Sequence, residues 1–361
     1  WVGFSLPFFV GSLKALHNYF NFIPTVVTQT SIPLFRNTAV LQIALSFPML
    51  GFSYLVNTDI AFSIWFFSLV MRAQEGIFGV LGISSPEKLY YAPPEPIVAH
   101  QGMGAFIVMV LFGLWTARAH LSDVFRKAFK GDDTVDDSEE MMSYRFAVFG
   151  LLLANVFIGM WLWTAGMEFW VVPIYLGTMY LVFLAVTRLV AEGGIAAARA
   201  PLIPSDFVSS SLGNSVLGPS TLVALGFTHV WASDIRTFVM ASTANGLKLA
   251  EEQLQKNKRS LFWAIGLSIV VSIAASVWAV MEMSYGYGGI NLNGWFFGPA
   301  GGPSYPWTYA TGELNNPDGP DTVGWIATGV GGSVMGLLML ARHHFLWWPM
   351  HPLGFAVSTI S

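Results

Sequence analysis

The chain has 361 residues, of which 54% are hydrophobic and only 11% are charged. Soluble globular domains carry about 25% charged residues, so this composition excludes an ordinary soluble domain and indicates an integral membrane protein. The formal net charge of −4 predicts no nucleic-acid partner, and the absence of cysteine excludes disulfides, thiolate metal sites and thiol nucleophiles.

Long uncharged runs predict the membrane spans, because a helix needs roughly 20 apolar residues to cross a bilayer. We expect an all-α polytopic membrane protein with about nine to ten transmembrane helices. In chain order, the candidate spans are residues 4–20, 38–56, 60–83, 98–117, 146–163, 169–187, 261–281, 323–341 and a last span from residue 353. Because the sequence begins and ends inside apolar segments, we interpret residues 1–361 as a single transmembrane domain, a fragment of a longer chain.

Lysine and arginine in the segments between spans predict the orientation. Residues 118–145, an amphipathic helix followed by an acidic loop, carry several of these cations, as do residues 248–259, so both should be cytoplasmic. Residues 284–321 contain no lysine or arginine and should be extracytoplasmic. This last segment is rich in aromatic residues. We expect an ordered loop that packs on the bundle or on a partner, because large exposed apolar patches normally mark contacts.

Residues 219–250 are the ambiguous part of the chain, since they are moderately apolar but contain several charged residues. The orientation requires the chain to enter the membrane after residue 188 and to return before residue 248. We therefore predict a re-entrant or short-helix hairpin. Irregular backbone at membrane depth is tolerated only where it is buried in protein or lines a watery cavity, so this hairpin indicates a pathway.

The stretch RLVAEGGIAAARAP places charges at the end of an uncharged span. Arg188 and Glu192 are four residues apart and share a helix face, so we predict that they pair. Gly193 and Gly194 should end the helix and act as a hinge. The pair is either an interfacial salt bridge without further function or part of a gate or substrate contact.

Two further groups of charged residues are candidates for a pathway. Arg72 and Glu75 lie about halfway along the third span, where ionisable residues are costly and face the bundle interior. They either neutralise each other or line a polar pathway. His229, Asp234 and Arg236 lie near the turn of the hairpin. There Asp234 either caps the following helix or faces the pathway.

Motifs for metals, haem and nucleotides are missing from the sequence, which has no His-Glu-x-x-His, no Cys-x-x-Cys-His and no P-loop. The histidines of RHHFLWWPMHP flank a Trp-Trp pair, a pattern typical of an interfacial aromatic belt. We therefore expect no metal site, no cofactor and no enzymatic activity. The run GVGGSVMG at residues 329–336 predicts a closely packed helix face.

Several blocks resemble a known family. NTDIAFSIWFFSLVMRAQEGIFGVLG, TRLVAEGGIAAARAP and WWPMHPLGFAVS resemble successive blocks of an uncharacterised prokaryotic family of large polytopic membrane proteins, itself distantly similar to the oligopeptide transporter superfamily. The resemblance implies the C-terminal part of a longer protein in a prokaryotic inner (cytoplasmic) membrane. Members of that family often continue the second block with a His-Asp pair, whereas this chain reads IAAARAP. The resemblance therefore does not extend to a shared substrate.

These patterns favour a secondary transporter that moves a small polar solute along a pathway lined by the charged candidates and the hairpin. The partners would be the lipid bilayer, the solute, and further copies of the chain or other membrane subunits. The alternative is a non-transporting structural subunit of a larger membrane complex, whose apolar helices serve protein and lipid contacts.

Overall fold

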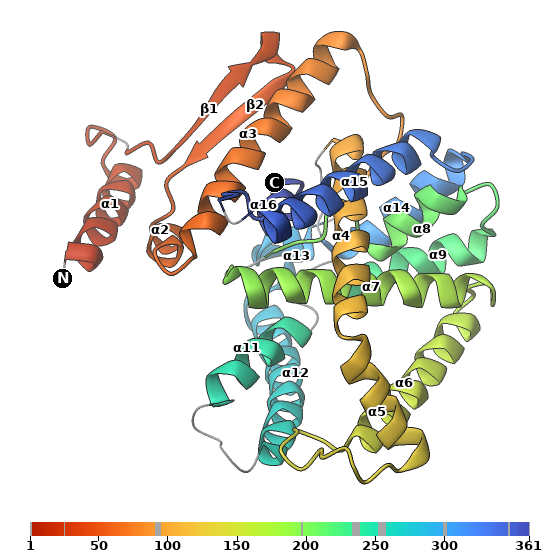
Figure 1. The fold of residues 1–361 in the computed structure, drawn as a ribbon. Helices are drawn as coiled ribbons and strands as arrows, with labels where there is room; N and C mark the ends of the chain where they lie inside the picture. The colour runs from red at the N-terminus through yellow and green to blue at the C-terminus, as the bar shows by residue number, and fades with distance from the viewer. Residues whose placement is uncertain are drawn as a thin grey trace.

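The computed structural model describes residues 2–24, 26–90, 95–195, 198–232, 239–251, 258–298, 302–345 and 347–360. These residues are mostly helical (Figure 1). The long helices are α1 (Val2–Tyr19), α3 (Thr58–Leu81), α4 (Pro96–Thr116), α6 (Tyr144–Thr164), α7 (Val171–Gly193), α12 (Arg259–Tyr287) and α15 (Thr322–His344). The shorter ones are α2 (Phe47–Ser53), α5 (Arg118–Lys130), α8 (Pro204–Leu212), α9 (Pro219–Phe227), α10 (His229–Ala232), α11 (Met240–Glu251), α13 (Gly294–Phe297), α14 (Tyr305–Asn315) and α16 (Pro352–Ser358).

Within the described ranges, 6 helices are long and apolar enough to cross a membrane, namely α3, α4, α6, α7, α12 and α15. The prediction of a polytopic α-helical membrane protein is therefore confirmed in its coarse form. The predicted count of nine to ten spans is not confirmed. α12 illustrates the character of these helices, since none of the residues in its apolar window is fully buried inside the chain, which leaves most of its surface exposed.

The predicted span over residues 38–56 is wrong. Strand β1 (Gln29–Leu34) pairs antiparallel with strand β2 (Ala39–Ala44), and α2 follows. Pro48 explains the error, because proline has no N–H to donate and occupies the first turn of a new helix instead of the middle of a long one. The β-hairpin formed by β1 and β2 lies against α3, where Thr38 Oγ1 donates a hydrogen bond of 3.2 Å to the Gly76 carbonyl.

α4 and α15 cross at very close range, and glycine makes the crossing possible. A side chain at Gly104 would collide with the backbone carbonyl of Thr328, and one at Gly331 would collide with the backbone of Gln101. Small residues at such contacts let two helix backbones approach closely. The prediction of a closely packed face over residues 329–336 is confirmed for Gly331 and Gly332, near the middle of α15, whereas Gly329 and Gly336 face open space.

The segment between α7 and α12 contains only short helices in its described parts. Residues 200–209 are all buried, and the first four of them are not helical. This irregular stretch leads into α8 and lies against α4, where Gly102 leaves room for Pro201. Further along, the predicted hairpin region of residues 219–250 contains α9, α10 and α11, with 9, 4 and 12 residues respectively.

The aromatic segment of residues 284–321 contains the end of α12, then α13 and α14. Tyr309 is fully buried, in agreement with the expected packing. Most of the other aromatic side chains are exposed within this chain, including Tyr285 at 84%, Trp295 at 57% and Trp307 at 59%. The described part of the bundle therefore does not bury most of these aromatic side chains, although the sequence led us to expect that they pack on the bundle or on a partner.

Candidate functional site

A polar cavity of about 540 Å³ lies at the start of α15, between the loop before α4, α8 and α14. Five of its lining residues are carboxylates, Glu87, Asp206, Glu313, Asp318 and Asp321. Among the described lining residues Lys88 alone is cationic, and its ammonium lies 5.3 Å from the centroid of the Tyr90 ring. We call this the acidic cavity. Its excess of negative charge suits a cation.

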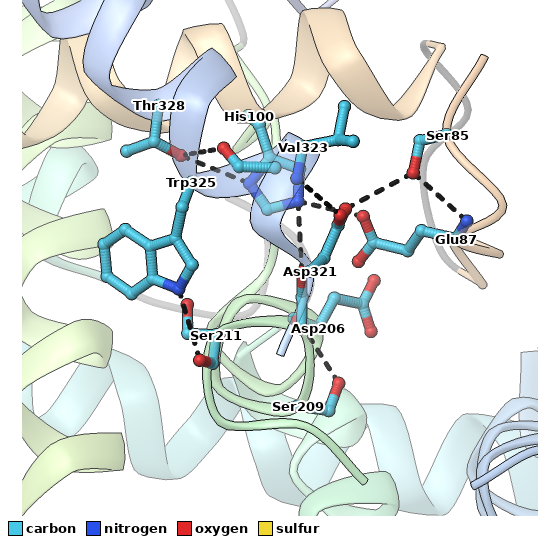
Figure 2. Close-up of polar contacts among 12 residues, drawn as sticks. Ser85, Glu87, His100, Asp206, Ser209, Ser211, Asp321, Val323, Trp325 and Thr328 are labelled. Atoms are coloured by element: carbon cyan, nitrogen blue, oxygen red, sulfur yellow. Dashed lines mark hydrogen bonds and ion pairs between the residues drawn. The ribbon is translucent and has the colours of Figure 1, made fainter. Parts of the chain in front are cut away.

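Three ligand atoms converge at one wall of the acidic cavity. His100 Nε2, a Glu87 oxygen and an Asp321 oxygen all lie within 4.8 Å of one another (Figure 2). The shortest of these contacts joins His100 Nε2 to Glu87 Oε2 at 2.9 Å. His100 is 2% exposed, so its imidazole is buried beside the part of the cavity wall that Glu87 and Asp321 line.

Neighbouring side chains fix the orientation of this cluster. Asp321 caps α15 by accepting the Val323 N–H at 3.0 Å with its Oδ1, and it accepts the Ser85 hydroxyl at 3.3 Å with its Oδ2. On the imidazole, Nδ1 lies 3.2 Å from Thr328 Oγ1, and Nε2 lies 3.2 Å from Ser210 Oγ. The cluster thus joins α4, α8, α15 and the loop before α4.

Asp206 is the most deeply buried carboxylate of the cavity, at 4% exposure. Its Oδ1 makes no hydrogen bond within the described residues. His229 Nε2 lies 3.5 Å from this oxygen, behind the cavity wall. His229 was a sequence candidate, and Asp206 connects it to the acidic cavity.

Glu313 faces the same cavity from α14. Burial is the main cause that raises its pKa from 4.5 to about 7, and the nearby Asp206 charge raises it further. Burial also raises the pKa of Tyr90 to about 12, with a contribution from Glu313. The backbone at Gly312 carries no side chain, which gives the Tyr90 hydroxyl room to lie against α14. Near neutral pH Glu313 therefore exchanges a proton easily.

A second cavity, of about 340 Å³, lies near the other end of α15. Its charged or titratable lining residues are Arg188, Glu192, Arg342, His343 and His351. We call it the basic cavity. Burial and the Arg342 charge lower the pKa of His351 to about 4.

Arg188 and Glu192 form the predicted pair in this basic cavity. Arg188 Nε donates to Glu192 Oε1 at 2.7 Å, and Arg188 Nη1 donates to the Met109 carbonyl at 2.9 Å. α7 ends at Gly193, and Gly194 follows in the left-handed conformation with a φ of 59°. The pairing and the helix end are as predicted, while a gating role stays a prediction.

The remaining candidates have different outcomes. Arg72 and Glu75 form an ion pair of 2.7 Å on α3, and neither lines the acidic or the basic cavity. Asp234 and Arg236 lie outside the described residues, so the predicted turn of the hairpin is not described either.

Sequence reasoning missed the residues of the acidic cavity. One signal was available: His100 is a polar residue near the start of an apolar span, and polar residues in such helices are usually functional. Glu87 and Asp321 gave no such signal, because each lies in a loop where charged residues are ordinary.

Membrane-length apolar helices, irregular buried backbone and a half-enclosed acidic cavity define a polytopic α-helical membrane protein with an internal polar site. The chain belongs to DUF6785, a family of unknown function, whose model matches residues 1–361. It matches no curated protein and no solved structure.

Proposed function

We propose that this chain is part of a secondary transporter for a small polar solute, and that the acidic cavity receives this solute. The observation that carries the proposal is the cavity itself, because five carboxylates surround a space of about 540 Å³ beside short, interrupted helices. Transporters of this class bind substrates on discontinuous helices. The sign of the charge favours a cationic solute.

The position of the two cavities supports a route between them. α15 begins at the acidic cavity and ends at the basic one. At a rise of 1.5 Å per residue, the 20 steps from residue 322 to residue 342 span about 30 Å, which is close to the thickness of the hydrocarbon core. The Lys/Arg distribution orients the acidic cavity toward the extracytoplasmic side and the basic cavity toward the cytoplasm. The same proposal places the protein in a prokaryotic inner membrane and relates it distantly to oligopeptide transporters. Both of these statements rest on the sequence alone.

Transport currents from proteoliposomes test the proposal. The full-length protein would be screened with cationic amino acids, polyamines, short peptides and metal chelates, with and without a pH gradient. We expect a current with at least one of these solutes and its loss in Asp206→Asn. Asp133→Asn is the matched control, because Asp133 is fully exposed in the acidic loop. Absence of current with every solute, or equal currents in both variants, would contradict the proposal.

The alternative function is a structural subunit of a larger membrane complex. The bare surface of α12 and the exposed aromatics of residues 284–321 favour it, because such surfaces normally mark contacts. Purification from native membranes in mild detergent separates the two functions. Copurification with other subunits in fixed stoichiometry supports the structural role, and a stable monomer or homodimer supports transport.

A further inference from the structure

We propose that Glu87, His100 and Asp321 bind a divalent first-row transition-metal ion. The three ligand atoms lie within 4.8 Å of one another. An ion that is about 2.0–2.2 Å from each ligand needs ligand atoms roughly 3–4 Å apart, so the three side chains surround a position of suitable size after small rotations.

The hydrogen bonds of His100 prepare its Nε2 as a ligand. The Thr328 hydroxyl donates its proton to the Gly324 carbonyl at 2.8 Å, so its oxygen accepts from His100 Nδ1–H. In the neutral imidazole the lone pair then lies on Nε2, only 2.9 Å from a Glu87 carboxylate oxygen. Either a proton on Nε2 or a bound cation can bridge the nitrogen and the carboxylate oxygen at this distance, and we assign that place to the metal ion. Metal-binding histidines usually donate the N–H of their other ring nitrogen to a neighbouring group, which fixes the tautomer, and here Thr328 is that neighbour of His100.

Gly324 keeps the space between the ligands open. A Cβ at this position would lie 2.6 Å from His100 Nε2 and 2.8 Å from Asp321 Oδ2. Any other residue would therefore place carbon beside both ligand atoms. The absence of a side chain at Gly324 therefore keeps carbon away from the nitrogen and the carboxylate in the first turn of α15.

Asp206 supplies an independent indication of a cation. Its side chain is 95% buried, it lines the same cavity as Glu87 and Asp321, and its Oδ1 makes no hydrogen bond within the described residues. His229 Nε2 lies 3.5 Å from this oxygen, which is too far for a good hydrogen bond, so a positive ion in the cavity would further offset the cost of burying this carboxylate. Figure 2 draws the Asp206 side chain below those of Glu87 and Asp321.

The ligand set indicates the class of metal. One imidazole with carboxylates suits Mn²⁺, Fe²⁺ or Zn²⁺, whereas Mg²⁺ and Ca²⁺ prefer oxygen ligands alone. This inference goes beyond transport, because a chain that moves no solute can still bind the ion. A binding assay in detergent therefore fails or succeeds independently of the proposed function.

Mn²⁺ titration of the purified full chain, stripped with EDTA, tests the site by electron paramagnetic resonance. We expect one bound Mn²⁺ per chain and competition by Zn²⁺ but not by Mg²⁺ at equal concentration. Glu87→Gln and His100→Gln should each weaken binding by about tenfold or more, since even changes in the outer shell of metal sites have effects of this size. Asp133→Asn is the control, because Asp133 is fully exposed in the acidic loop and its loss should leave Mn²⁺ binding unchanged.

Two further measurements keep the test independent of folding. Asp321→Asn retains a good helix cap for α15, so its loss of binding would not reflect a missing cap. In the unaltered protein, the spectrum of bound Mn²⁺ should show coupling to one ¹⁴N nucleus, which disappears in His100→Gln. Lack of stoichiometric binding in the unaltered chain, ¹⁴N coupling that survives in His100→Gln, or equal weakening in Asp133→Asn would overturn the proposal.

Discussion

The two cavities at the ends of α15 have opposite charge. The acidic cavity surrounds a single lysine with carboxylates, and the basic cavity surrounds the Glu192 carboxylate with arginines and histidines. In each, burial and like charges favour the neutral form of one residue: the pKa of Glu313 is raised to about 7, and the pKa of His351 is lowered to about 4. The comparison shows that one helix connects two sites that attract ions of opposite sign and respond to opposite changes of pH.

The largest expected effect is on stability, and it comes from forcing α4 and α15 apart at their crossing, between the two cavities. Gly104→Val would push a side chain into the Thr328 carbonyl. Overpacking of this kind against backbone costs about 3 kcal/mol or more. Thermal unfolding in detergent should show a large loss of stability, and Gly336→Ala on α15 is the control, because its Cβ would meet open space. A wild-type melting point in Gly104→Val would contradict the close crossing.

The next largest effect is a loss of stability at alkaline pH that arises from Glu313 in the acidic cavity. Since the folded pKa of Glu313 is about 7 and its ordinary value is 4.5, the folded state loses stability as pH rises through this interval. Glu313→Gln stays neutral, so it should be more stable than wild type at pH 8, by about 1–2 kcal/mol after allowance for solvent screening. At pH 4 the two proteins should unfold alike. Melting curves at both values check this, and Asp133→Asn should show no such gain.

The mirror-image effect belongs to the basic cavity. The folded pKa of His351 is about 4 and its ordinary value is 6.5, so stability is complete above pH 6.5 and is lost as pH falls toward 4. His351→Asn removes the titration but can still cap α16, where His351 Nδ1 accepts the Leu353 N–H at 3.2 Å. We expect the variant to lose less stability than wild type between pH 7 and 4, by about 1 kcal/mol after discounting for exposure. Parallel acid unfolding curves for the two proteins would argue against it.

The smallest effect concerns the pair that the sequence predicted. Glu192 is 50% exposed and Arg188 27% exposed, so breaking their contact with Glu192→Gln should cost only about 0.5 kcal/mol. Arg188→Gln should cost more, because it also leaves the Met109 carbonyl without its donor. Chemical denaturation of the two variants measures the difference. Equal losses would show that the bond to Met109 contributes nothing.

Local features of the fold could be predicted from the sequence. Bilayer thickness dictates the length of an apolar helix, so spans such as α4 and α7 follow from uncharged runs. Spacing along one helix predicted the contact of Arg188 with Glu192, and the glycines after them predicted the helix end. Residues 38–56 show the limit of this reasoning, because mean apolarity does not separate a strand from a helix.

The acidic cavity could not be predicted in the same way. Glu87, His100 and Asp321 come from separate parts of the chain, and only the crossing of α4 with α15 brings them together. No spacing rule connects residues that meet through tertiary packing. The polar residue in an apolar span was a usable signal for His100, but it did not identify the partners.

The glycine crossing has a mechanical consequence. It holds α15 near its midpoint, so the helix resembles a beam on a pivot with one cavity at each end. A tilt of about 10° about that pivot would carry each end through roughly 3 Å, since each arm is about 15 Å long. The two ends of a stiff beam move in opposite directions. A tilt that moves the end beside Asp321 in one direction therefore moves the end beside Arg342 in the other, and the position of the two glycine contacts sets the ratio of the two arms.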